Sequence, residues 1–341
     1  MIHFDSDYIE GCIPEILEAL TKTNDEQTVG YGEDEHSKHA KELIKEAIGN
    51  NDSEVYFLCG GTQANVTVIS SILKNYQGAI CASSGHINVH ETGAIEACGY
   101  KCLTIPSNDG KIYSDDIEKM IKDHFASDVA PHMVQPGLIY ISFPTENGTL
   151  YSKKELEDIY NVAKATNTPL FIDGARLGYG LASSKNDLTI KDIAKLCDVF
   201  YIGGTKVGAL FGEAVVINNP LYQKDFKYHI KQHGAMLAKG RMLGIQFEEL
   251  FKNNKYLEIS KHCIDMAELL AKGFEDKGYK FKYEAETNQL FPIISKEKIK
   301  ELRKSFGFEY WEPYDEEHDV VRFVTSFMTK KENIDILIDA L

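Results

Sequence analysis

The sequence predicts an α/β fold in which a mostly parallel sheet carries helices on both faces and a smaller α+β domain follows. Between residues 54 and 217, short apolar runs alternate with amphipathic segments. This switching between the periods of strand and helix is typical of right-handed strand–helix–strand units. Beyond about residue 240, long helical segments and then short alternating runs replace the pattern. We therefore expect a large domain at residues 1–240 and a small one at 241–341.

The apolar runs and the segments between them define the expected elements. Residues 153–166 have helical spacing, with Leu156, Ile159 and Ala163 on one face. Strands are expected at residues 54–58, 78–82, 102–105, 138–143, 170–172, 198–202 and 214–217, and further helices at 62–75 and 190–196.

Bulk composition excludes several classes of protein. The 341 residues include 37 basic and 52 acidic side chains, a net charge of −15, which argues against nucleic acid or an anionic membrane as partner. No apolar run approaches the roughly 20 residues that span a bilayer. The acidic N-terminus is unlike a secretory signal, and the seven cysteines are odd in number without CxxC spacing. We expect reduced thiols in a cytoplasmic protein, without a zinc site or disulfides.

Three segments that follow expected strands carry the candidate chemistry, because ligands of open parallel sheets bind beyond the carboxyl ends of the strands. The first is Gly60-Gly61-Thr62, which opens a helix. Its glycines let the backbone approach a ligand, and free amides at the helix start favour an anion. A simple tight turn between strand and helix remains the alternative.

The second segment is Asp173-Gly174-Ala175-Arg176, directly after an apolar strand. A carboxylate at the end of a buried strand needs a partner, because an unpaired buried charge is costly. A protonated ring nitrogen or a structural arginine would serve, and Asp173 could equally be a helix cap.

The third segment is Gly203-Gly204-Thr205-Lys206. No acidic residue lies within six positions of Lys206 along the chain. Desolvation beside an apolar strand would favour the neutral amine that imine chemistry needs. An anion pocket, a carboxylate and a lysine match the phosphate, pyridine nitrogen and aldehyde of pyridoxal 5′-phosphate. The 33-residue interval from Asp173 to Lys206 fits one helix and a returning strand.

The same segments resemble the fold-type I (aspartate-aminotransferase-like) pyridoxal-phosphate enzymes, and among them the threonine aldolase and β-eliminating lyase family. The resemblance runs from residue 4 to about 329. It is carried, in order, by Phe4-Asp5-Ser6-Asp7 with Gly11 and Pro14, Tyr31-Gly32-Glu33-Asp34, Gly60-Gly61-Thr62-Gln63-Ala64-Asn65, His86, His90-Glu91, Gly93-Ala94, Asp173-Gly174-Ala175-Arg176 and Arg322.

The resemblance implies a role for each candidate residue. The cofactor would be held by Gly61, Thr62, Thr205 and Arg241 at its phosphate, by His86 stacked on its ring, by Asp173 at its pyridine nitrogen and by Lys206 as the Schiff base. Arg176 would lie beside the ring or bind the substrate. The substrate carboxylate would bind Ser6 and Arg322, with His132 near the substrate hydroxyl. Tyr31 would lie near the site and reach toward a neighbouring subunit.

Two histidines and Arg322 have alternative interpretations. His86 and His90 could ligate a metal, but an HExxH spacing and a third ligand are absent, so no metal is expected. His132 could be a loop residue without a role. Arg322 alternates with apolar neighbours and is either an edge-strand surface residue or an inward carboxylate binder.

The resemblance implies retro-aldol cleavage of L-threonine, L-allo-threonine or a phenylserine-type amino acid to glycine and an aldehyde. The Gly-Gly-Thr-Lys-Val-Gly segment departs from the SKGLGAP-like segment of low-specificity aldolases and is closer to the phenylserine aldolase branch, which leaves the substrate open. Elimination or transamination on the same scaffold, and a relative that binds without cofactor, are the rivals. A homodimer or homotetramer is expected by analogy.

Overall fold

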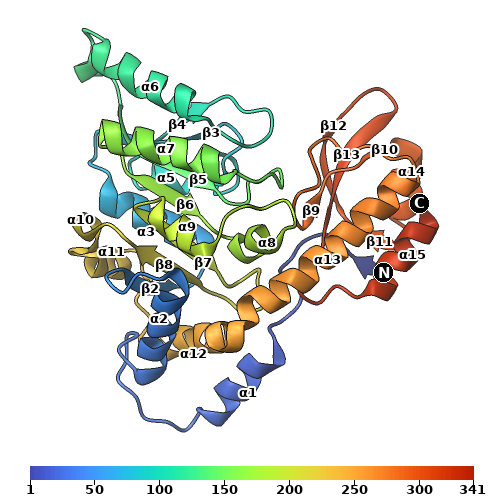
Figure 1. Ribbon diagram of the computed structural model, residues 1–341, viewed down its shortest axis with the longest axis horizontal. Helices are drawn as coiled ribbons and strands as arrows, with labels where there is room; N and C mark the ends of the chain where they lie inside the picture. Colours follow the sequence, from blue (N-terminus) through green and yellow to red (C-terminus); the bar gives the residue numbers. More distant parts are fainter.

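The computed structural model describes residues 1–341 and has a large lobe and a smaller one (Figure 1). The large lobe is built on a seven-stranded sheet in the order β2-β8-β7-β6-β5-β3-β4. Its strands are β2 (Glu54–Leu58), β3 (Gln77–Ala82), β4 (Lys101–Ile105), β5 (Gln135–Ser142), β6 (Leu170–Asp173), β7 (Val199–Gly203) and β8 (Glu213–Ile217). Only β8 is antiparallel to its neighbours, β2 and β7. The predicted mostly parallel sheet is confirmed.

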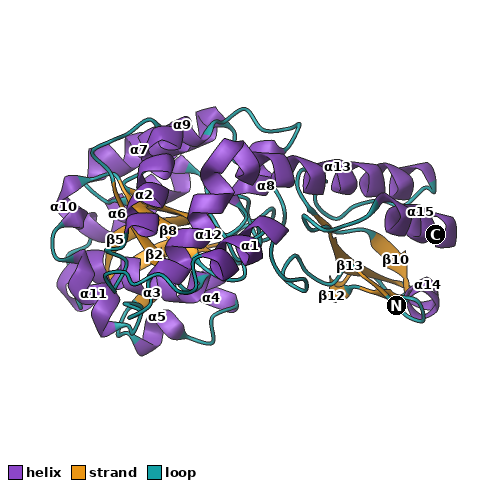
Figure 2. Ribbon diagram, turned by 90° about the horizontal axis from the view of Figure 1, so that it is seen from below, coloured by secondary structure: helices purple, strands orange, loops and turns teal.

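Helices cover both faces of this sheet (Figure 2). One core cluster contains side chains of α2 (Glu35–Ile48), α6 (Ser114–Ala126), α7 (Lys153–Thr166) and α9 (Ile190–Lys195). The other contains side chains of α3 (Gly61–Ile72), α4 (His86–Val89), α5 (Ala94–Ala97) and α11 (Phe226–Gln232). The lobe also includes α1 (Pro14–Lys22), η1 (Ala130–His132), α8 (Leu177–Ala182), α10 (Pro220–Gln223), α12 (Arg241–Phe251) and η2 (Lys252–Asn254).

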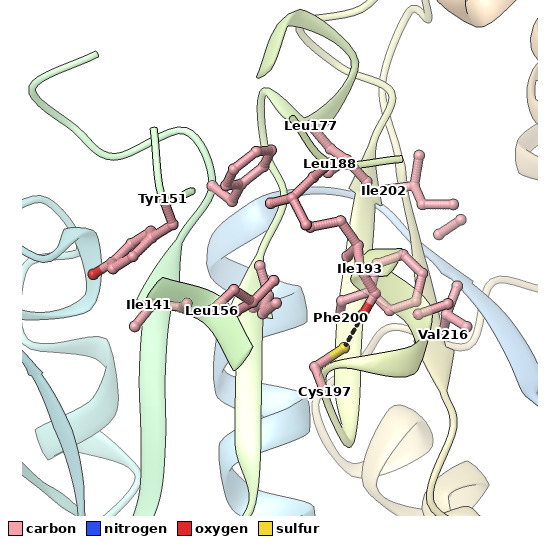
Figure 3. Packing of buried hydrophobic residues seen from close by; sticks show 14 of the residues in the cluster. Ile141, Tyr151, Leu156, Leu177, Leu188, Ile193, Cys197, Phe200, Ile202 and Val216 are labelled. Carbon is pink, nitrogen blue, oxygen red and sulfur yellow. Dashed lines mark hydrogen bonds between the residues drawn. The ribbon is translucent and has the colours of Figure 1, made fainter. Parts of the chain in front are cut away.

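Strand β5 shows why an uninterrupted apolar run makes a central strand. Its side chains alternate between the two faces, so Ile139 and Ile141 join one cluster, whereas Leu138 and Tyr140 join the other. A strand buried on both faces needs apolar residues at every position. Figure 3 shows how Ile141 lies near Leu156 of α7 in the first cluster.

The predicted helix at residues 153–166 is confirmed at both ends. Ser152 accepts a hydrogen bond from the backbone of Glu155, whose side chain accepts one from the Ser152 amide in return. This capping box satisfies two amides that the first helical turn leaves free. At the other end Asn167 adopts a left-handed conformation, which ends the helix.

The smaller lobe combines the two ends of the chain. Its antiparallel sheet contains β9 (Gln289–Leu290), β10 (Ile293–Ser295), β12 (Glu309–Pro313) and β13 (His318–Val324). Near the N-terminus, β1 (Ile2–His3) pairs with β11 (Phe306–Gly307), and α14 (Lys296–Leu302) and α15 (Lys331–Ala340) complete the lobe. Helix α13 (Lys255–Asp276) runs between the lobes (Figure 1). No helix is both long and apolar enough to cross a bilayer.

The predicted domain division at residue 240 remains a prediction, and two contacts bear on it. Helix α12 lies beyond residue 240, yet its Glu248 hydrogen-bonds to His36 and His39 of α2. Residues 2 and 3 pair with a strand of the small lobe. These contacts support a division along α13, with the first residues assigned to the small lobe.

Two glycines let the ends of β6 and β7 approach each other closely. A Cβ on Gly203 would lie 2.1 Å from the carbonyl oxygen of Ala175, and one on Gly174 would lie 1.9 Å from that of Tyr201. The Gly203 amide donates to the Gly174 carbonyl at 2.9 Å. This approach holds Asp173 and the segment leading to Lys206 side by side.

We therefore expect Gly203→Ala to lower the free energy of unfolding by about 1–3 kcal/mol or more, because the backbone must shift to admit a methyl group. Chemical unfolding followed by circular dichroism measures the loss. Gly11→Ala is the matched control, since its Cβ would meet nothing within 4 Å. Equal stability of the two variants would contradict the role given to this close approach.

Candidate active site

The carboxyl ends of four strands and the amino end of β8 meet at one cavity of about 310 Å³. Seven residues singled out in the sequence line it together, namely Gly61, Thr62, His86, Asp173, Arg176, Thr205 and Lys206. They come from strand ends far apart in the sequence. The structure thus brings the expected anion pocket, carboxylate and lysine into one place.

Asp173 is the most extensively hydrogen-bonded of these residues. The hydroxyls of Tyr140 and Tyr201 donate to its two carboxylate oxygens, and the Asn65 amide donates to one of them at 3.0 Å. Burial acts to raise the pKa of Asp173, but the charge of His86 and these hydrogen bonds outweigh it, so the pKa lies below its usual value. The carboxylate is therefore ionised and available to a cationic partner.

Lys206 has the opposite environment. Its side chain is partly buried in the cavity wall and forms no ion pair within 4.0 Å. Burial and the charge of Arg176 lower the pKa of the Lys206 amine, while Asp7, Asp173 and Glu213 oppose the shift. Desolvation thus favours the neutral amine, the form that attacks a carbonyl.

His86 is positioned by a chain of polar contacts that starts at Asp173. Asn65 bridges Asp173 to Glu91, donating to the Glu91 carboxylate at 2.7 Å. The same Glu91 oxygen lies 2.8 Å from Nδ1 of His86. The backbone amide of His86 donates to Glu146, another carboxyl in the cavity wall. Nε2 is the ring nitrogen of His86 that has no partner in the protein.

Arg176 is bound by a carboxylate of the N-terminal segment. Its Nε and Nη2 atoms donate to the two oxygens of Asp7 at 2.7 and 3.0 Å. Asn288, from the small lobe, also donates to Asp7, at 2.9 Å. This buried group joins the N-terminus, the large lobe and the small lobe beside the cavity.

Arg322 lies beside the cavity and not in its wall. The arginine is on β13, where Gln289 accepts from one guanidinium nitrogen and Glu309 from another. The guanidinium Cζ of Arg322 lies 5.5 Å from the centroid of the Trp311 ring. The side chain is 11% exposed, which excludes the edge-strand surface interpretation. Its Nε is buried without a partner, and such an orphaned donor beside the buried Arg176 fits a carboxylate ligand.

Besides Arg322, three predicted residues from other parts of the chain lie outside the wall of this cavity. Ser6 is buried next to Asp7 in the chain but does not line the cavity. Tyr31 is 55% exposed and lines a second cavity of about 230 Å³. Arg241 donates to the carbonyls of Thr23, Asn24 and Glu26. Within one chain, therefore, neither Tyr31 nor Arg241 reaches the site.

His132 does not line the chain's own cavity, and its place near the substrate hydroxyl remains a prediction. His132 is exposed in η1, three residues before β5 begins at Gln135. The cavity lies past Ser142, where β5 ends. An eight-residue strand is on the order of 25 Å long, so this histidine is at the opposite edge of the sheet.

The residues present fit pyridoxal phosphate. The helix α3 begins in the cavity wall with Gly60 as N-cap and no side chain capping its free amides, so these amides are available to a phosphate. An ionised carboxylate suits a protonated pyridine nitrogen, and an unpaired amine suits an aldehyde. All three lie in one cavity of matching chemistry.

Comparison with known proteins agrees with this geometry. The beta-eliminating lyase family model matches residues 3–297. The chain belongs to this family. It is 31% identical over 314 residues to the low specificity L-threonine aldolase of Pseudomonas sp. (strain NCIMB 10558), covering 90% of this chain and 88% of that one.

Solved structures extend the likeness to three dimensions. Threonine aldolase of Leishmania major has a TM-score of 0.96 and 42% identity, covering 99% of this chain and 98% of that one. The histidinol-phosphate aminotransferase of Clostridium acetobutylicum, at 15% identity, has a TM-score of 0.73 and covers 100% of this chain and 98% of its own, which shows a shared fold. The predicted fold-type I architecture is confirmed.

Several residues of this family member's site were missed in the sequence. Tyr140 and Tyr201 carry hydroxyls at buried strand positions, an unusual feature that could have singled them out. Glu213 was missed because only residues following strands were considered. Since β8 is antiparallel, its first residue lies at the same edge as the last residues of its neighbours.

We expect Asp7→Asn to lower the free energy of unfolding by about 3–5 kcal/mol at neutral pH, because the buried Arg176 loses its counter-ion. Burial acts to raise the pKa of Asp7, but the charges of Arg176 and Lys206 and the hydrogen bonds from Arg176 and Asn288 hold it below its usual 3.8. A lowered folded-state pKa contributes stability above the unfolded value and loses it as the pH falls.

The difference in stability between Asp7→Asn and the wild type should therefore be full at neutral pH and narrow as the pH falls below about 3.8. Urea unfolding over a pH series measures it. Asp5→Asn is the matched control, since Asp5 pairs with the half-exposed His3. A difference that persists unchanged in acid would contradict the ion pair.

Proposed function

We propose that this chain is a pyridoxal-phosphate-dependent aldolase that cleaves L-threonine and related β-hydroxy-α-amino acids to glycine and an aldehyde. The observation that carries the proposal is the unpaired amine of Lys206 in the same cavity as the ionised Asp173. Membership of the beta-eliminating lyase family and the 42% identity to a threonine aldolase support it.

The bound cofactor supplies the electron-accepting ring that bond cleavage at an amino-acid Cα requires. Lys206 provides the amine that holds it, and Asp173 keeps a proton on the pyridine nitrogen because its hydrogen bonds hold the carboxylate ionised. Gly61 and Thr62 offer amides to the phosphate at the start of α3. His86 lies in the wall where a ring would stack.

Substrate recognition is assigned to the arginines and His86. The orphaned Nε of Arg322 and the nearby charge of Arg176 favour a carboxylate beside the cavity. Ser6 is proposed to assist them. Breaking the Cα–Cβ bond requires a base for the hydroxyl proton. The proposed acceptor is Nε2 of His86 in its uncharged form, with Nδ1 held by Glu91.

The proposal predicts equal amounts of glycine and aldehyde from at least one of L-threonine, L-allo-threonine and phenylserine. Lys206→Ala should reduce the rate at least about a thousand-fold and abolish the visible band of a cofactor bound to Lys206. The exposed Lys195→Ala is the control and should leave both unchanged. Ammonia with a keto acid as products, or no glycine from all three substrates, would exclude the aldolase function.

We also propose a homodimer or homotetramer in the cytoplasm. The predicted roles of Tyr31 and Arg241 require a second copy, because neither lines this chain's own cavity. The odd number of cysteines and the lack of CxxC spacing favour reduced thiols, as in the cytoplasm.

Mixing two inactive variants tests the shared site. Lys206→Ala and Arg241→Ala chains, unfolded and refolded together, should regain about one quarter of wild-type activity, because half of random dimers are hybrids with one complete site each. Each variant refolded alone should remain inactive. If the mixture gains nothing while light scattering shows assembled oligomers, Arg241 does not serve a neighbouring site.

A further inference from the structure

Glu213 is a buried carboxyl placed between the anion pocket and Lys206. It is the first residue of β8 and pairs with Leu58 on one side and Gly203 on the other. Leu58 is two residues before Gly60, and Gly203 is three residues before Lys206. Glu213 lines the cavity, although its exposed fraction is only 3%.

The hydrogen bonds of Glu213 come from neutral donors. Its two oxygens accept from the Gly204 amide at 3.1 Å and from the Thr205 hydroxyl at 2.8 Å. The Thr205 oxygen in turn accepts from the Gly212 amide, at 2.9 Å. The Thr205 proton is therefore directed to Glu213, and no lysine, arginine or histidine forms an ion pair with this carboxyl.

A bound phosphate would conflict with an ionised Glu213. The expected phosphate would bind at Gly61 and Thr62, which line the same cavity as the carboxyl. Two anions in a buried site repel each other, and one of two such groups then keeps its proton. A carboxylic acid differs from a carboxylate in having a proton to donate.

We propose that Glu213 binds the cofactor phosphate as a neutral carboxylic acid and donates a hydrogen bond to it. In this arrangement Glu213 takes the donor role at the phosphate that Thr205 was expected to fill, and Thr205 holds Glu213 in position. The inference rests on the proposed cofactor and adds a residue to its site. It makes retention of the phosphate dependent on a proton carried by the protein.

The surroundings of Glu213 favour its protonated form near neutral pH. Burial raises the pKa of Glu213 to about 8, with hydrogen bonds from Thr205 and Gly204 and the charge of Lys206 opposing the shift. Asp173, on β6, adds to the rise, and the hydroxyls of Tyr201 and Tyr256 face it as neutral groups. A bound phosphate adds negative charge and raises the pKa of Glu213 further.

Phosphorus NMR of the cofactor-loaded protein tests the proposal. Between pH 6 and 10, the phosphate resonance of the wild type should move in one step above pH 8, when Glu213 loses its proton. Between about pH 8, the pKa of Glu213 in the free protein, and this step, the affinity for the cofactor should fall about tenfold per pH unit. Glu213→Gln keeps a neutral side chain, so both its resonance and its affinity for the cofactor should remain constant over this range.

Glu146→Gln is the matched control, because Glu146 is another carboxyl of this cavity but accepts its hydrogen bonds from Ser142 and the His86 amide. It should keep the wild-type step. A step that survives in Glu213→Gln, or a wild-type resonance that stays constant to pH 10, would overturn the proposal. If the glutamine variant does not fold, the wild type still tests the proposal, because a resonance that stays constant to pH 10 would overturn it.

Failure of the proposed function is distinguishable from failure of this inference. A protein that binds no pyridoxal phosphate shows neither a visible band nor a bound phosphorus resonance. A protein that shows both, with a resonance insensitive to Glu213, keeps the cofactor and loses only the role of this residue.

Discussion

Burial of an ionised carboxylate at Asp173 is the constraint on which the site depends. The charge is stable there because Tyr140 from β5, Tyr201 from β7 and Asn65 from α3 all donate to it. Each donor belongs to a different element, so the strands and the helix must be in register for the charge to be tolerated. The same network continues through Glu91 to His86. The packing of the sheet and the geometry of the site therefore depend on the same hydrogen bonds.

A second buried charge group connects the lobes around this centre. Asp7, Arg176 and Asn288 come from the N-terminal segment, the large lobe and the small lobe. The hydrogen bonds among these three residues hold the small lobe, which carries Arg322, in place relative to the cavity. The pairing of β1 with β11 adds a backbone link of the same kind. The part of the site assigned to the substrate carboxylate is thus assembled by contacts between segments at opposite ends of the chain.

Prediction from the sequence succeeded where a local strand pattern could be combined with the rule that ligands bind beyond the carboxyl ends of parallel strands. Parallel strands deliver their last residues to one edge of the sheet, so Asp173, Lys206 and the Gly61–Thr62 segment could be expected together. It did not extend to Glu213, because the direction of β8 depends on its partners β2 and β7. Nor did it show that His132 lies at the opposite edge of the sheet from the chain's own cavity, because sequence order does not say at which edge a loop residue lies.

The sequence by itself determined the alternation of strands and helices, the apolar faces of the core and the residue types available at the strand ends. These follow from periodicity and local chemistry, which act over a few neighbouring residues. Only the tertiary structure decided that Arg322 is buried, that Arg176 is paired with Asp7 and that Thr205 donates to Glu213. Such pairings depend on distances between segments remote in the chain, and these distances exist only once the lobes have packed.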